Sequence, residues 1–117
     1  MSEPPAAILD VYEVGETTVV GFGERDVLDN INLALCREQL VALLKANNSH
    51  TLGFDLTGVK IVPSGFLGLM ASVRSLGVQV HLYNPSADVR DVLETTNLDK
   101  IMPIHEIDFS NRKSDNP

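Results

Sequence analysis

The stretch DLTGVKIVPSGFLGLMASVRSLGVQVHL, residues 55–82, contains the pattern that decides the fold. An apolar strand over Thr51–Leu56 runs into it, a short loop covers Thr57–Pro63, and a helix is predicted over Ser64–Leu76. Gly77 is a residue that typically ends a helix. Leu67, Met70 and Val73 form the apolar stripe of this helix. Val78, Val80 and Leu82 alternate with polar positions, as in a strand. A strand–helix–strand unit with Ser64 at the start of its helix is therefore predicted.

Two further strands and a helix are predicted on the N-terminal side of this unit. Ile8–Val14 and Thr17–Phe22 are rich in β-branched residues and are separated by Gly15 and Glu16, which favours a β-hairpin. Asn30–Ala46 carries apolar residues at spacings of three and four, which predicts an amphipathic helix with Asp29 or Asn30 as its N-cap.

On the C-terminal side, Asn84-Pro85 predicts a turn, Ser86–Thr95 a helix and Ile101–Ile107 a short last strand. This alternation is typical of an α/β domain with a mixed, mostly parallel sheet of four to five strands, an N-terminal hairpin and three to four packed helices. We expect one domain over residues 1–107 and a flexible tail over 108–117.

Composition excludes several classes of function. The chain has 117 residues, a net charge of -7 and no cluster of Lys or Arg, which argues against direct nucleic-acid binding. No apolar run approaches the roughly 20 residues of a membrane span, and no signal peptide precedes the domain, so a cytoplasmic protein without membrane insertion is expected. Cys36 is the only cysteine and the three histidines are far apart, so neither a metal nor a cofactor is expected.

Ser64 is the residue with the clearest chemical interest. Serine is among the preferred N-caps, so one interpretation is purely structural. The other is that its exposed hydroxyl accepts a phosphoryl group, which adds about -1.5 to -2 charges at the positive end of the helix dipole. The two interpretations are compatible.

An enzymatic role for Ser64 has little support. The sequence Val62-Pro63-Ser64-Gly65-Phe66 lacks the first glycine of a Gly-x-Ser-x-Gly nucleophile elbow, and a catalytic base would have to be His81 or His105. We therefore expect no catalytic residue in this chain and no enzyme activity.

The neighbours of Ser64 suggest a docking surface. Gly65 and Gly68 weaken the helix by roughly 1 kcal/mol each relative to alanine, which indicates either close packing against the sheet or a flat surface with Phe66 exposed at its edge. Glu24 and Asp26 follow the second strand and are expected at the same end of the sheet, as loop charges or as an acidic rim that a basic partner senses.

These residues resemble the STAS domain, the family of the bacterial anti-sigma factor antagonists, from about Val11 to Glu106. The likeness is carried by Asp55-Leu56-Thr57-Gly58-Val59, Ser64, Leu67-Gly68, Leu76-Gly77-Val78-Gln79-Val80, Asn84-Pro85, Val89-Arg90, Val92-Leu93 and Asn97-Leu98-Asp99-Lys100-Ile101. The resemblance implies a cytoplasmic regulator of transcription whose phosphoacceptor is Ser64. Its partner would be an anti-sigma factor that is also a serine kinase, or another signalling protein, and contact with a nucleotide through that partner is possible.

The resemblance also implies a partner surface that includes Asp26 of the first loop, with Glu24, Pro63, Gly65, Phe66 and Gly68 around it. The chain departs from the family pattern at the phosphoacceptor, where Pro63 replaces an aspartate and Gly65-Phe66 replaces a hydroxyl residue and glycine. Proline removes a carboxylate and a backbone donor. The alternative is therefore a constitutive STAS binding module, in a stress-signalling assembly or beside a transporter, without phosphorylation.

Overall fold

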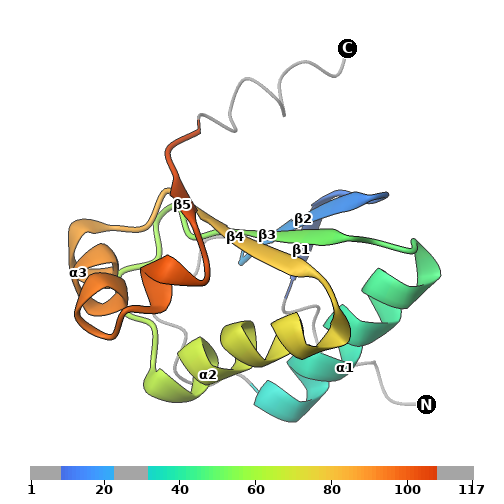
Figure 1. Ribbon diagram of the computed structural model, residues 1–117, viewed down its shortest axis with the longest axis horizontal. Coiled ribbons are helices and arrows are strands. Elements are labelled where there is room, and N and C mark those ends of the chain that lie inside the picture. The colour runs from blue at the N-terminus through green and yellow to red at the C-terminus, as the bar shows by residue number, and fades with distance from the viewer. Residues whose placement is uncertain (1–8, 23–31, 108–117) are drawn as a thin grey trace, which may run out of the picture.

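A computed structural model describes residues 9–22 and 32–107 of the chain. Its centre is one five-stranded sheet in the order β1 (Asp10–Glu13), β2 (Thr17–Gly21), β3 (Thr51–Asp55), β4 (Gln79–Tyr83) and β5 (Ile104–His105) (Figure 1). β1 pairs antiparallel with β2, and the other neighbours are parallel. The predicted α/β fold with an N-terminal hairpin and a mostly parallel sheet is confirmed.

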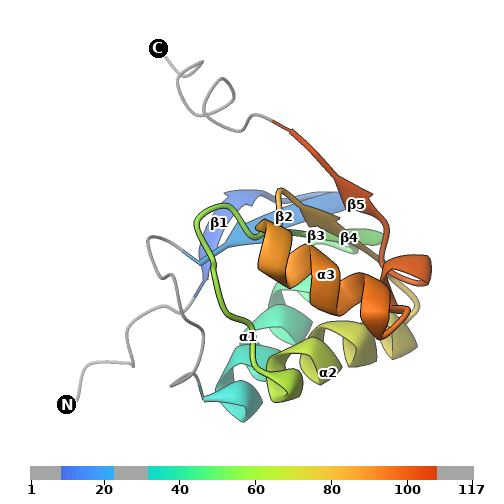
Figure 2. The same ribbon diagram turned by 90° about the vertical axis from the view of Figure 1, so that its left-hand side faces the viewer.

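The helices cover one face of this sheet. α1 (Leu33–Ala46), α2 (Ser64–Ser72) and α3 (Ala87–Thr95) lie on the same side of the strands, so none of the helices in the described ranges covers the opposite face (Figure 2). A 3-10 turn, η1 (Val73–Leu76), continues α2 until Gly77 ends it with a φ of 89°. No helix in the described part of the chain is long and apolar enough to span a bilayer. The core between the layers is formed by fully buried side chains that include Leu40, Phe54, Phe66, Met70 and Leu82.

Two predicted boundaries are wrong. The N-cap of α1 is Asn32, whose side-chain oxygen accepts a hydrogen bond from the Leu35 N–H at 3.0 Å, in place of Asp29 or Asn30. The last strand is also shorter than Ile101–Ile107. The 3-10 turn η2 (Leu98–Lys100) precedes it, and the N–H groups of Ile101 and Met102 donate hydrogen bonds to the Leu98 carbonyl. Met102 is completely buried. Pro103 has no N–H to donate to β4, and although its carbonyl accepts a hydrogen bond from the Leu82 N–H at 2.8 Å, β5 begins only at Ile104.

Two histidines meet on the helix-free face of the sheet. Nδ1 of His81 on β4 lies 2.7 Å from Nε2 of His105 on β5, and the ring planes are inclined by only 14°. One nitrogen must donate the proton and the other must accept it, so this contact is incompatible with two protonated rings. Burial, and then the charge of His105, lower the pKa of His81 from its usual 6.5.

This pair predicts a loss of stability in acid. The unfolded chain binds a proton at His81 more readily than the folded chain does, so the free energy of unfolding falls as the pH drops from about 6.5 toward the lowered pKa. Urea unfolding between pH 8 and pH 5, with the wild-type chain and with His81→Gln, measures this effect. In His81→Gln the free energy of unfolding is expected to fall less between pH 8 and pH 5 than in the wild type. In His50→Gln, at an exposed site, it is expected to fall as in the wild type. Identical pH profiles for wild type and His81→Gln would contradict the account.

Candidate functional site

Ser64 is the first residue of α2 and not its N-cap. The N-cap is Pro63, which has extended backbone angles, φ -64° and ψ 155°. The carbonyl of Pro63 accepts hydrogen bonds from the N–H groups of Phe66 and Leu67 at 2.9 and 3.1 Å. Proline is suited to this place because its missing N–H is not needed there. The prediction that Ser64 caps the helix with its side chain is therefore wrong by one residue.

The Ser64 hydroxyl is free to react. The side chain is exposed, and no residue of the described ranges hydrogen-bonds to it. The first turn of α2 contains no acidic residue. Because the first N–H groups of a helix lack partners within the helix, an anion at this position is favoured by about 0.3–1 kcal/mol. The site can therefore accept a phosphoryl group without strain on α2.

A buried carboxylate fixes the start of the loop that leads to Ser64. Asp55, at the end of β3, is 5% exposed and accepts hydrogen bonds from the Tyr12 hydroxyl at 2.7 Å and from the Thr57 N–H and hydroxyl at 3.0 and 2.5 Å. Burial, followed by the contact with Asp55, raises the pKa of Tyr12 well above its usual value. These bonds tie β1, β3 and the loop together.

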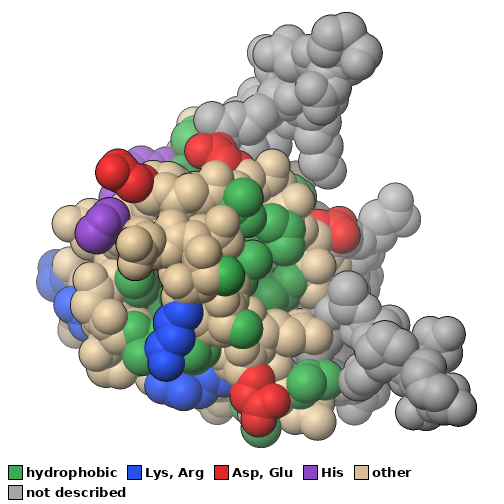
Figure 3. Space-filling view, turned by 90° about the vertical axis from the view of Figure 1, so that its right-hand side faces the viewer, with side chains coloured by type: hydrophobic (Ala, Val, Ile, Leu, Met, Phe, Trp, Pro, Cys, Tyr) green, Lys and Arg blue, Asp and Glu red, His purple; other side chains and the backbone are tan. Residues whose placement is uncertain are grey.

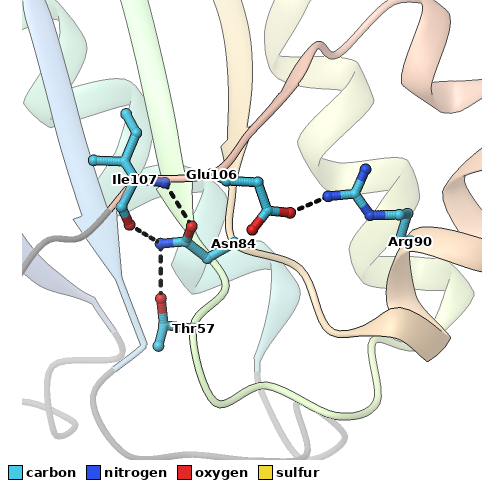
Figure 4. Close-up of polar contacts among 5 residues, drawn as sticks. All are labelled: Thr57, Asn84, Arg90, Glu106 and Ile107. Atoms are coloured by element: carbon cyan, nitrogen blue, oxygen red, sulfur yellow. Dashed lines mark hydrogen bonds and ion pairs between the residues drawn. The ribbon is translucent and has the colours of Figure 1, made fainter.

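Asn84 extends this network to the end of β5. Its side chain donates to the Thr57 hydroxyl at 3.1 Å and to the Ile107 carbonyl at 2.5 Å, and it accepts from the Ile107 N–H at 2.7 Å (Figure 4). Arg90 of α3 forms an ion pair with Glu106 beside it. The ends of β3, β4 and β5 are therefore held together at the start of the loop that leads to Ser64.

An apolar groove of about 200 Å³ lies between this loop and α3. Ile61 and Val92 both line it, with 55% and 42% of their surfaces exposed. Lys60 and Asp88 add one charge of each sign to its walls. The groove continues to Leu67, one turn into the helix that Ser64 starts. The loop, α2 and α3 therefore form one exposed apolar depression near the serine.

Phe66 does not belong to this surface. Its side chain is 0% exposed, and its ring meets Phe22 edge to face at a centroid distance of 5.2 Å. The expectation that Phe66 is exposed at the edge of a docking surface is wrong, because residue 66 shares the inward face of α2 with Met70 and Val73. All three are 0% exposed.

The two glycines differ in their surroundings. A Cβ on Gly65 would lie 3.0 Å from Cδ1 of Leu33, so this glycine permits close packing of α1 and α2. A Cβ on Gly68 would meet no described atom within 4 Å, and the residue is exposed. The close approach at Gly65 is therefore to α1 and not to the sheet, as the packing interpretation expected, whereas Gly68 is compatible with the flat-surface interpretation. Glu24 and Asp26 lie outside the described residues, so the expected acidic rim remains a prediction.

No alternative chemistry is brought to Ser64 by the described residues. Neither His81 nor His105 hydrogen-bonds to the serine, and each has a nitrogen engaged with the other. The described residues contain no group of three metal-ligating side chains. Cys36 is buried, which raises the pKa of its thiol to about 11. The geometry is that of an exposed hydroxyl beside an apolar groove.

Comparison with known proteins identifies the family and the fold. The STAS domain family matches residues 10–107. Among solved structures, the unphosphorylated anti-sigma factor antagonist SpoIIAA is similar with a TM-score of 0.70 and 16% identity, covering 91% of this chain and 93% of that one. A STAS domain protein of Planctomyces limnophilus has a TM-score of 0.70 and 19% identity, over 91% and 95% of the two chains.

A third structure, a putative anti-sigma factor antagonist of Thermotoga maritima, has a TM-score of 0.67 and 21% identity, over 91% and 92% of the two chains. No curated protein sequence matches the chain. At these identities the structural likeness supports the fold, while the family match covers nearly all of the described residues.

Proposed function

The chain belongs to the STAS domain family, and from this premise we propose that it is a non-enzymatic anti-sigma factor antagonist whose partner binding is controlled by phosphorylation of Ser64. The partner would be an anti-sigma factor that is also a serine kinase. The observation that carries the proposal is the exposed Ser64 hydroxyl at the first position of α2, to which no residue of 9–22 or 32–107 hydrogen-bonds.

The groove beside Ser64 supports the binding half of this proposal. Ile61 and Val92 are large exposed apolar residues on neighbouring elements, and such residues are typical of protein-protein contact sites. Ser64 does not line the groove itself, but it lies on the same helix as Leu67, which does, so a partner that covers the groove would come close to the serine. A phosphate there would place new negative charge inside the contact.

Phosphorylation of Ser64 is tested by mass mapping of the chain isolated from its native cells, grown with and without stress. We expect one added phosphate whose position is Ser64 and whose occupancy changes with growth condition. A serine-to-alanine chain, Ser64→Ala, expressed in the same cells serves as the control and is expected to lack this phosphate. A chain that stays unmodified in every condition would contradict regulation by phosphorylation.

The second candidate is a constitutive STAS binding module. The observation in its favour is Pro63, which occupies the N-cap and offers neither a carboxylate nor an N–H to a kinase. In that case the groove alone would bind the partner, and Ser64 would be only the first residue of the helix.

A further inference from the structure

Two shallow grooves meet where β4 begins. They share no lining residue with the apolar groove beside Ser64. The larger, about 310 Å³, is lined by Arg74 of η1 and by Lys100 of η2. The smaller, about 200 Å³, is lined by Lys45 near the end of α1. Val78 borders both, so the grooves form one surface. We call this surface, defined by Lys45, Arg74, Lys100 and the residues between them, the basic face.

The basic face concentrates positive charge on an acidic chain. The chain carries a net charge of -7, yet no carboxylate of the described residues lines either groove. No described residue forms an ion pair with the three cations. Two apolar side chains, Leu76 and Ile101, are 40% and 38% exposed beside them. In Figure 3, Lys and Arg side chains lie among green side chains on this end of the molecule.

A surface of opposite character lies on the outside of α3. Asp88, Asp91 and Glu94 are exposed there, and Val92 is 42% exposed between them. The one cation of this helix, Arg90, is already paired with Glu106. α3 lies at the left end of Figure 1, whereas β4 starts toward the right, so the part of the basic face at the start of β4 is separated from α3.

We propose that the basic face of one copy of this chain binds the acidic outer side of α3 on a second copy. Each surface combines three like charges with exposed apolar side chains, and the two sets of charges are complementary. Because the two surfaces differ, the contact is head-to-tail and does not close into a dimer. Surface ion pairs contribute about 0–1 kcal/mol each, and the net charge of the copies opposes association, so binding is weak and reversible.

This contact has a consequence for the groove beside Ser64. Asp88, Val89 and Val92 of α3 line that groove, so a second copy bound to α3 covers it. Self-association would then compete with partner binding, and this consequence alone rests on the proposed function. The contact itself requires neither phosphorylation nor a partner.

Sedimentation velocity of the full chain, from micromolar to millimolar concentration, tests the proposal. The average mass of the wild type is expected to rise steadily with concentration, and Arg74→Glu is expected to abolish that rise. The matched control is Arg37→Glu, an equal charge change at an exposed site of α1 that lines neither groove. Lys100→Glu replaces Arg74→Glu if thermal unfolding shows that the first variant does not fold.

A charge swap identifies the surface that the basic face binds. Asp91→Arg alone is expected to lose self-association. In an equimolar mixture, Asp91→Arg keeps its basic face and Arg74→Glu keeps its acidic α3. The mixture is therefore expected to form only pairs of the two variants, and association stops at two copies. A wild type that remains monomeric at every concentration would overturn the proposal. Equal losses for Arg37→Glu and Arg74→Glu would also overturn it, because the effect would then come from net charge.

Discussion

Replacing Phe66 with alanine is expected to lower the free energy of unfolding by about 3–5 kcal/mol, because the change removes a fully buried aromatic ring. The ring of Phe66 meets Phe22 edge to face, and Phe22 in turn stacks on Phe54 at a centroid distance of 6.1 Å. Truncation therefore opens a cavity between α2 and the sheet and removes an aromatic pair. Equilibrium unfolding in urea, monitored by far-UV circular dichroism, measures the loss.

A variant in the same helix provides the contrast. Gly68→Ala adds a methyl group that meets no described atom within 4 Å, at an exposed helical position, and is expected to stabilise the chain by up to about 1 kcal/mol through helix propensity. A loss near zero for Phe66→Ala would place the ring at the surface and restore the docking role that the sequence suggests for it. The pair of variants thus separates the inner and outer sides of α2.

The sequence predicts the helix that contains Phe66 but not the burial of Phe66 itself. The periodicity of α2 predicts the helix and its buried Met70 and Val73, and the same spacing includes residue 66, four positions before Met70. The signal for a buried Phe66 was therefore present. Gly65 and Gly68 favour an exposed surface at this end of the helix, and this second pattern outweighs the periodicity at residue 66.

Other parts of the site depend on contacts that the sequence does not encode locally. Tyr12 and Asp55 are 43 positions apart, and Asn84 and Ile107 are 23 apart, so only the sheet order brings them together. The apolar groove likewise needs Ile61 of the loop beside Val92 of α3. Its one sequence signal is the pair of apolar residues Ile61 and Val62 within a loop. The alternation of strands and helices predicts a mostly parallel sheet, but neither the order of the strands nor the contacts between distant loops follows from it.

The second large effect concerns partner affinity. Ser64→Asp is expected to weaken binding to the partner by about 2–4 kcal/mol, roughly 30-fold to 1000-fold, whereas Ser64→Ala binds as the wild type does. The aspartate places a fixed charge at the first position of α2, beside Leu67 and the apolar groove. Its desolvation on binding opposes the contact. The same charge is favourable for the free helix, so weaker binding would not result from unfolding of α2.

The measurement uses the partner that Ser64→Ala recovers from native cells, purified and titrated with each variant by isothermal calorimetry. Ser75→Asp is the matched control, because Ser75 is an exposed serine on η1, at the other end of the helical segment that Ser64 starts. If Ser64→Asp and Ser64→Ala bind the partner equally, charge at this position does not control the contact. The chain then acts as a constitutive STAS module whose groove binds without a switch. If only Ser64→Asp loses affinity, the exposed hydroxyl at the start of α2 is the control point.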